Sequence, residues 1–120
     1  MIAWDGGGPV MATLRASTPL LKLATSVHIL HVQEGPEPAE GVPPEAAAAY
    51  LSRYGIHAVI ERVTAHQQRP DPLILEACAA RRARSCLMGA YGKGRLREEL
   101  FGGVTRRLLD AAQLPLLLGH

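Results

Sequence analysis

The chain has 120 residues, which is the ordinary size of a single domain. Hydrophobic residues make up 48% of it and charged residues 20%, and this excludes a disordered chain, which would have fewer apolar residues and a larger net charge. The formal net charge of +2, from 13 basic and 11 acidic residues, predicts neither DNA binding nor attachment to an acidic membrane surface.

Nothing in the sequence predicts secretion or insertion into a membrane. The N-terminus lacks the basic region and long apolar stretch of a signal peptide, and the apolar runs are far shorter than the roughly 20 residues of a membrane-spanning helix. The two cysteines, Cys78 and Cys86, form no CxxC pair and no zinc pattern with histidine. We therefore expect a cytoplasmic protein with reduced thiols, in which both cysteines are buried as small hydrophobic side chains.

Apolar, β-branched runs alternate with helical patterns along the whole chain. Strands are predicted over residues 1–5, 26–32, 56–65, 85–88 and 114–118. Helices are predicted over residues 10–24, 43–54, 73–82 and 104–112. Pro19 is expected to kink or interrupt the first helix, and Asp71 and Pro72 are expected to form the N-cap and first position of the third. The alternation predicts βαβ units, and therefore a three-layer, Rossmann-like α/β sandwich with a five-stranded parallel sheet.

Two glycine-containing loops follow the first and fourth predicted strands. The first loop is Asp5-Gly6-Gly7-Gly8, and the second begins with Gly89-Ala90-Tyr91-Gly92 and ends with Gly102-Gly103-Val104-Thr105. Both lie at carboxyl ends of strands, where open α/β sheets bind ligands. Glycine allows the backbone to approach a ligand closely, and the free N–H groups at the start of the last helix favour phosphate. Thr105 can add a hydroxyl group there, and basic side chains nearby can add charge, namely Arg95, Arg97, Arg106 and Arg107.

At these positions the chain resembles the universal stress protein family. Nucleotide-binding members of that family carry Gly-x2-Gly-x9-Gly followed by Ser or Thr, and Gly89, Gly92 and Gly102 have this spacing. The N-terminal run Ala3-Trp4-Asp5-Gly6 and the C-terminal run Leu114-Pro115-Leu116-Leu117-Leu118 are also similar to the family's sequences. Two residues depart from the pattern, because Gly103 replaces the Ser or Thr and Gly7 replaces a small hydroxyl residue.

The resemblance implies a stress-response module with strand order 3-2-1-4-5, as in adenine-nucleotide alpha hydrolase-like proteins. It implies that the protein binds AMP, or ATP with Mg²⁺, with Asp5 at the adenine side, and that it acts by association rather than by catalytic turnover. Asp5 can equally be a polar cap where the strand meets the glycine turn. One alternative is a dimeric scaffold of the same family that binds no nucleotide, and another is a slow ATPase. The nucleotide-binding residues that the resemblance implies are Asp5, Gly6, Gly7, Val32, Gly89, Gly92, Gly102, Gly103, Val104 and Thr105.

Catalytic and metal-binding patterns are missing from the sequence. There is no Gly-x-Ser-x-Gly elbow, no P-loop lysine motif, and no nucleophile with a base at a recognisable spacing. His28 and His31 lie three residues apart on a predicted strand, so they face opposite sides of the sheet and cannot hold one metal ion together. We therefore expect no catalytic residues and no metal site.

The last predicted strand, residues 114–118, is expected to form an edge of the sheet. Pro115 removes one backbone donor, which is tolerated at an edge, and an uncovered apolar edge favours pairing with another strand. The resemblance implies a homodimer in which this strand meets its own copy antiparallel across a two-fold axis, with Leu117 as a side chain of the interface. We expect residues 1–120 to form one domain, either alone or as half of a tandem protein that packs against its sister domain.

Overall fold

The computed structural model of the protein describes residues 1–36, 40–90 and 103–119. Its strands are β1 (Ile2–Trp4), β2 (Val27–Gln33), β3 (Ala58–Thr64), β4 (Cys86–Gly89) and β5 (Leu116–Gly119). Its helices are α1 (Gly8–Leu21), α2 (Pro44–Ser52), α3 (Pro70–Ala80) and α4 (Val104–Ala111). The strands form one parallel sheet in the order β3-β2-β1-β4-β5, which confirms the predicted fold class and strand order.

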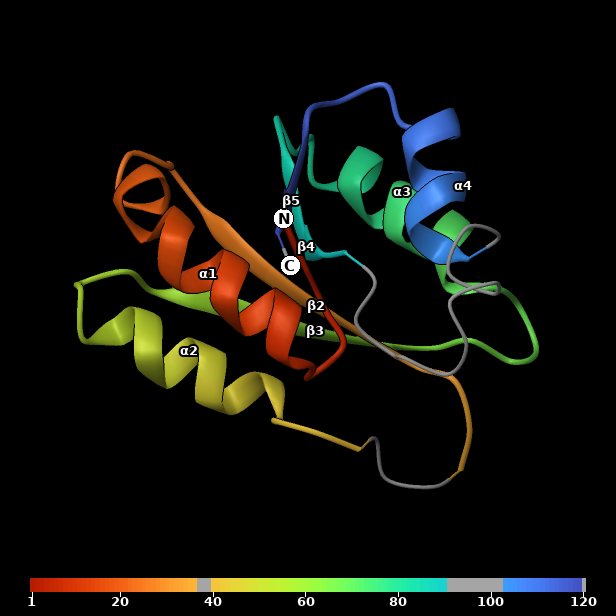
Figure 1. The fold of residues 1–120 in the computed structure, drawn as a ribbon, viewed down its shortest axis with the longest axis horizontal. Coiled ribbons are helices and arrows are strands. Elements are labelled where there is room, and N and C mark those ends of the chain that lie inside the picture. The colour runs from red at the N-terminus through yellow and green to blue at the C-terminus, as the bar shows by residue number, and fades with distance from the viewer. Residues whose placement is uncertain (37–39, 91–102, 120) are drawn as a thin grey trace.

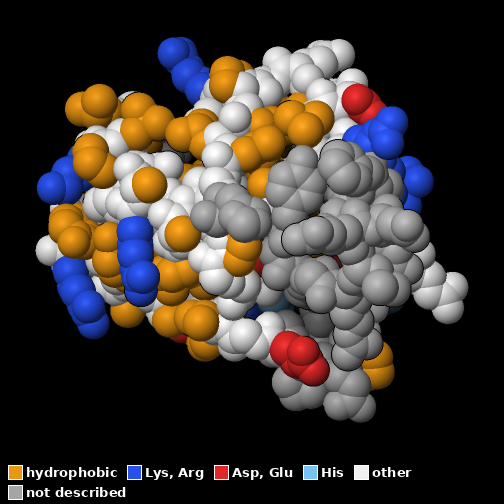
Figure 2. All heavy atoms as spheres, in the orientation of Figure 1, with side chains coloured by type: hydrophobic (Ala, Val, Ile, Leu, Met, Phe, Trp, Pro, Cys, Tyr) orange, Lys and Arg blue, Asp and Glu red, His pale blue; other side chains and the backbone are white. Residues whose placement is uncertain are grey.

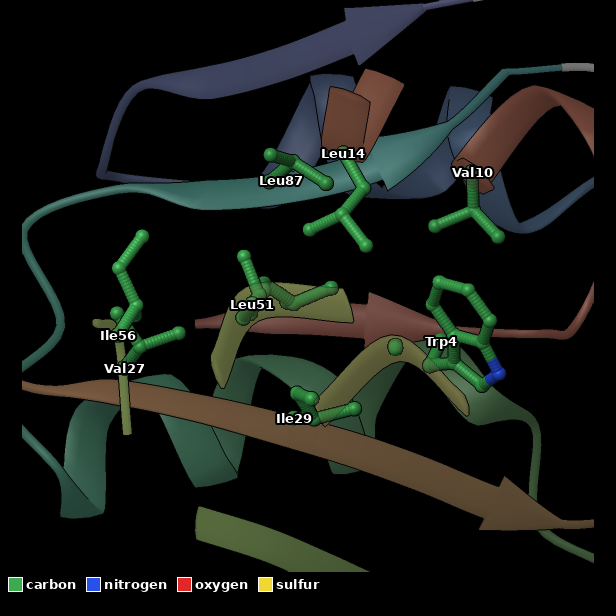
Figure 3. Close-up of a cluster of buried hydrophobic side chains, with 10 residues drawn as sticks. Trp4, Val10, Leu14, Val27, Ile29, Leu51, Ile56 and Leu87 are labelled. Carbon is green, nitrogen blue, oxygen red and sulfur yellow. The ribbon is translucent and has the colours of Figure 1, made fainter. Parts of the chain in front are cut away.

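Helices cover both faces of the sheet, two on each side (Figure 1). Helices α1 and α2 pack on one face, where they enclose a core that includes Trp4 of β1 (Figure 3). Helices α3 and α4 pack on the other face, around a second core that includes Ala3 of the same strand. Each large aliphatic side chain that is fully buried contributes roughly 1.5–3 kcal/mol to folding. The fully buried side chains of this kind are Ile2, Leu14, Ile29, Leu30, Leu51, Leu108 and Val10.

The start of α3 differs from the sequence prediction. Asp71 was expected to cap the helix with Pro72 in the first position, but α3 begins at Pro70 and its N-cap is Arg69. Proline suits the first helical position because its fixed φ is helical and its missing N–H would have no partner there. Asp71 therefore lies inside the first turn, where its carboxylate is buried and pairs with Arg107 of α4.

Two other prolines, Pro19 and Pro115, lie at or near the ends of elements. Helix α1 continues past Pro19 to Leu21, so this proline does not interrupt the helix but occupies its last turn. Strand β5 begins at Leu116 rather than Leu114, because Pro115 has no N–H to offer the sheet. The carbonyl oxygen of Pro115 still accepts a hydrogen bond of 3.0 Å from the backbone N–H of Cys86, so β4 and β5 are joined from this point onward.

The outer strands of the sheet are β3 and β5, and β1 lies at its centre. Within the described ranges, no helix is both long enough and apolar enough to span a membrane. The expectation that Cys78 and Cys86 are buried is confirmed, since their exposed fractions are 3% and 1% and both sulfurs are free thiols.

Candidate functional site

The direction in which helices leave the sheet reverses between β1 and β4. These strands are hydrogen-bonded neighbours, with Ala3 opposite Met88, yet α1 follows β1 onto one face and α4 follows β4 onto the other. In open α/β sheets such a reversal, at the carboxyl edge of the sheet, marks the place where ligands bind. The first and fourth strands are neighbours, as the expected strand order 3-2-1-4-5 has them.

Gly6 has a conformation and a position that only glycine tolerates. Its φ is +77°, in the left-handed region, and a Cβ at this residue would lie 2.7 Å from the carbonyl oxygen of Val42. The Gly6 carbonyl accepts a hydrogen bond of 2.9 Å from the Val42 N–H. The indole N–H of Trp4 donates to the Val42 carbonyl at 2.8 Å. The first glycine loop is thus fastened to the segment that precedes α2, a contact between residues about 40 positions apart in the sequence.

Asp5 and Gly7 form a polar cap at the start of α1. One carboxylate oxygen of Asp5, Oδ1, accepts a hydrogen bond of 2.9 Å from the Gly7 N–H, and Gly7 is the N-cap residue of the helix. The Asp5 residue is half-buried, so its carboxylate remains within reach of solvent. This geometry supports the structural role that the sequence allowed for Asp5, and it leaves the second carboxylate oxygen outside that hydrogen bond.

Gly89, at the end of β4, allows the sheet to approach the start of α1. A Cβ at Gly89 would lie 2.5 Å from the backbone nitrogen of Val10, which is closer than any real contact of this kind. The neighbouring Ala90 donates its N–H to the Gly119 carbonyl at 2.7 Å and so continues the pairing of β4 with β5. Gly92 and Gly102, the other two glycines of the predicted motif, lie outside the described residues.

Helix α4 begins at the same edge, and its N-cap residue is a glycine. Its N-cap is Gly103, which has no side chain to cap the helix, and its first turn contains no acidic residue. Val104 and Thr105, both half-buried, form this first turn. The positive end of the helix dipole is therefore directed at the carboxyl edge, which favours an anion such as phosphate.

Arg107 holds this end of α4 against α3. Its Nε lies 2.9 Å from Oδ1 of Asp71, and that carboxylate also lies 3.6 Å from Nε of Arg69. The Asp71 side chain is only 8% exposed, so removing Arg107 would leave this buried charge with only the longer contact to Arg69. Arg107, which the sequence offered as a phosphate ligand, is thus committed to Asp71, whereas Arg106 is exposed. Arg95 and Arg97 lie outside the described residues.

The carboxyl end of β2 completes the described part of the edge. Trp4 pairs with His31, which places Val32 beside Asp5 in the next register position. Val32 packs on the α3 and α4 face, against the second core. His31 faces the other side, with Nδ1 3.2 Å from the Trp4 carbonyl oxygen. His28 lies on the Val32 side, where its Nδ1 is 3.1 Å from Glu61 Oε1, so the two histidines face opposite sides as expected.

Sequence reasoning missed the residues that hold the loops from a distance. Val42 lies in a proline- and glycine-rich segment with no distinguishing pattern, and Asp71 was assigned to a cap because of its local sequence. Their partners, Gly6 and Arg107, are more than 30 residues away. Over the ranges that the structure covers, no group of three His, Cys, Asp or Glu side chains could hold a metal ion.

The fold and this edge define a class of protein, the Rossmann-like α/β domains whose ligands bind where the strand order reverses. Within that class, residues 12–119 match the sequence pattern of the Universal stress protein family, and the chain belongs to this family. A solved structure of a protein from the universal stress protein family of Burkholderia pseudomallei has a similar fold, with a TM-score of 0.69 at 19% sequence identity. The similarity covers 98% of this chain and 92% of that one. A search of curated proteins found none that matches the chain.

The packing around Gly6 predicts that this glycine is needed for folding even without a ligand. Gly6→Ala should lower the free energy of unfolding by about 1–3 kcal/mol, because alanine is strained at this φ and meets the Val42 carbonyl. Gly8→Ala is the matched control, since no atom lies within 4 Å of a Cβ there and Gly8 is helical. It should leave stability unchanged or raise it by up to about 1 kcal/mol. Urea unfolding of both variants measures the difference, and equal stabilities would contradict this account.

Proposed function

We propose that this protein is a stress-response module that binds an adenine nucleotide, AMP or ATP, at the carboxyl edge of the sheet. The nucleotide lies between residues 5–8 and residues 89–105, with its base near Asp5 and Val32 and its phosphates at the start of α4. The observation that carries the proposal is the reversal between β1 and β4, since α4 begins at the same edge of the sheet as the loop that follows β1. Membership of the universal stress protein family supports the same assignment.

Each described residue of this edge has a definite part in the proposal. The half-buried Asp5 offers its second carboxylate oxygen to a base N–H group, while the first holds Gly7 in place. The backbone N–H groups of Val104 and Thr105 donate to phosphate oxygens, and the Thr105 hydroxyl adds one further donor. Mg²⁺, when ATP is the ligand, is held mainly by the phosphates, since this cation keeps several waters and binds few protein groups in such sites.

The protein acts through association rather than turnover in this proposal. Hydrolysis of ATP requires a group that positions or deprotonates the attacking water. Two acidic side chains that the structure describes at this edge already have partners: one oxygen of Asp5 accepts a hydrogen bond from the Gly7 N–H, and Asp71 pairs with Arg107. The nucleotide is therefore a bound signal that changes what the protein associates with, and slow hydrolysis is a side reaction at most.

One observation favours a second candidate function, a scaffold of the same family that binds no nucleotide. The steric demands of Gly6 and Gly89 are fully met by Val42 and by the start of α1, so these two glycines have a reason to be present without a ligand. Gly7 and Gly103 also lack the hydroxyl groups that the family pattern has there. The two candidates differ in whether adenine nucleotides bind at all, which a titration decides.

The proposed phosphate site is tested by a charge at Thr105. Glutamate in the first turn of α4 suits the helix dipole and should not unfold the protein, but it repels phosphate. Thr105→Glu should therefore raise the dissociation constant for AMP by about tenfold or more, whereas the neutral variant Thr105→Gln should bind close to the wild-type protein.

Calorimetric titrations of the wild-type protein and both variants with AMP and with adenosine provide the readout. Adenosine lacks the phosphate, so it should bind the Glu and Gln variants equally. Wild-type protein that binds neither ligand would favour the scaffold function. Equal affinity of the Glu and Gln variants for AMP would place the phosphate elsewhere.

We further propose that the protein assembles as a homodimer through β5. This strand is an outer strand of the sheet, and Leu118 is a large hydrophobic residue with 37% of its surface exposed. Leu117 is a poor probe of the interface, because its side chain packs against the first core of its own domain. Leu118 is therefore a better residue than Leu117 to substitute in a test of dimerisation.

Leu118→Lys should convert the dimer to monomers at micromolar concentration, because an unpaired ammonium group in an apolar contact is costly. Val59→Lys is the matched control, since Val59 is 54% exposed on β3, the opposite edge of the sheet. It should leave the dimer intact. Sedimentation equilibrium on the three proteins gives the result, and a monomeric wild-type protein or a dimer indifferent to both substitutions would refute the interface.

A further inference from the structure

A cavity opens between the C-terminal halves of α3 and α4, at the amino edge of the sheet. Its volume is about 290 Å³. It lies away from the candidate nucleotide site, because these helix ends lead into the starts of β4 and β5 rather than following their carboxyl ends. Hydrophobic side chains gather over the part of the surface where α3 and β5 lie (Figure 2). The lining consists of Leu75, Cys78, Ala79, Arg82, Ala83, Ala111, Gln113 and Leu114.

Two thiols meet beneath this cavity. Cys78 of α3 lines it, and Cys86 of β4 lies behind Cys78 in the second core without lining the cavity. Both thiols are free, and both residues are almost completely buried. The segment that joins them is short, since only seven residues separate them along the chain. The cavity thus gives a small molecule a route to one thiol, whose neighbour is a second thiol.

The two sulfur atoms affect each other's ionisation. A hydrogen bond with the Cys86 side chain lowers the pKa of Cys78 to about 7, despite the opposing effect of burial. The same hydrogen bond and burial raise the pKa of Cys86. Cys78 is therefore the thiol of the pair that ionises first, and the thiolate is the form of cysteine that reacts with oxidants. The accessible thiol and the reactive thiol are the same residue.

We propose that Cys78 and Cys86 form a peroxide-sensitive thiol pair that closes to a reversible disulfide. The Cys78 thiolate attacks one oxygen of hydrogen peroxide that has entered the cavity, the O–O bond breaks, and the departing hydroxide takes a proton to leave as water. Cys78 is then a sulfenic acid. The Cys86 sulfur attacks the Cys78 sulfur, the S–O bond breaks, and a second water leaves with the Cys86 proton. Two thiols are oxidised by two electrons, and one peroxide is reduced to two waters.

The size and lining of the cavity select the oxidant. A volume of about 290 Å³ admits hydrogen peroxide or a small alkyl hydroperoxide but no folded protein thiol. Protein thiols therefore reach the sulfenic acid less readily than Cys86 does. The pair accordingly ends as an internal disulfide rather than as a mixed disulfide or an over-oxidised Cys78.

The test treats the reduced, full-length protein with hydrogen peroxide at pH 7 and follows intact mass and free thiols. The expected product has lost two hydrogen atoms and both thiols, and dithiothreitol restores it. The Cys78→Ala variant should not react. The Cys86→Ala variant should stop at a sulfenic acid on Cys78, which dimedone traps. This sulfenic acid should form about threefold more slowly than in the wild-type protein, because losing the hydrogen bond from Cys86 reduces the thiolate fraction of Cys78 more than it raises the nucleophilicity of its sulfur.

A second pair of variants tests the cavity without touching the thiols. Ala79→Leu fills the cavity, whereas Ala80→Leu places the same bulk on the next exposed residue of α3, which does not line it. Ala79→Leu should slow the reaction at least about threefold, since access limits thiol chemistry, and Ala80→Leu should leave the rate unchanged. The rate should also rise with pH through about 7, as Cys78 ionises.

Several results would overturn the proposal. They are a wild-type protein that does not react, sulfinic acid on Cys78 as the main product, a disulfide between two chains, or equal rates in the Ala79→Leu and Ala80→Leu variants. None of these outcomes depends on nucleotide binding, so the experiment tests the thiol pair independently of the proposed function.

Discussion

The three residues of β1 are the constraint on which the rest of the structure depends. Ile2, Ala3 and Trp4 are all buried, and their backbone pairs with β2 on one side and β4 on the other. Side chains of this short strand enter both cores, because alternate residues face opposite sides of the sheet. A parallel sheet must be covered on both faces. Helices α1 and α2 therefore cover one face and helices α3 and α4 the other, and the change of face falls between β1 and β4.

The candidate site follows from this arrangement. The chain leaves β1 and β4 toward opposite faces of the sheet at the carboxyl edge, and residues at this edge also hold the fold together. Gly6 contacts the backbone of Val42, and Gly89 contacts the start of α1. Asp71 and Arg107 then fix α4 beside this edge. Gly6 and Gly89, which we propose to lie in the binding site, therefore also have a structural role, and their presence in a sequence does not by itself separate the two roles.

The order of elements and the outer position of β5 could be predicted from the residues, because alternating apolar runs and Gly or Pro punctuation are local signals. The strand order was implied by the resemblance to the family. The structure also confirms that both cysteines are buried and that His28 and His31 face opposite sides of the sheet. Asp71 was assigned wrongly because its partner, Arg107, is 36 residues away and leaves no local signal. The cavity above Cys78 could not be predicted either, since it depends on how two helix ends pack. Nucleotide binding by Asp5, Val32 and Thr105 stays a prediction.

The central claim is that an adenine nucleotide binds where β1 and β4 part. Amide NMR spectra of the isotopically labelled protein, recorded with increasing AMP, test it most directly, because each backbone N–H reports its own surroundings. The account predicts the largest shifts at the amides of Asp5, Gly7, Val104 and Thr105, with the amides around the Cys78 cavity and on β3 unchanged. Shifts confined to other parts of the molecule, or no shifts at millimolar AMP, would contradict it.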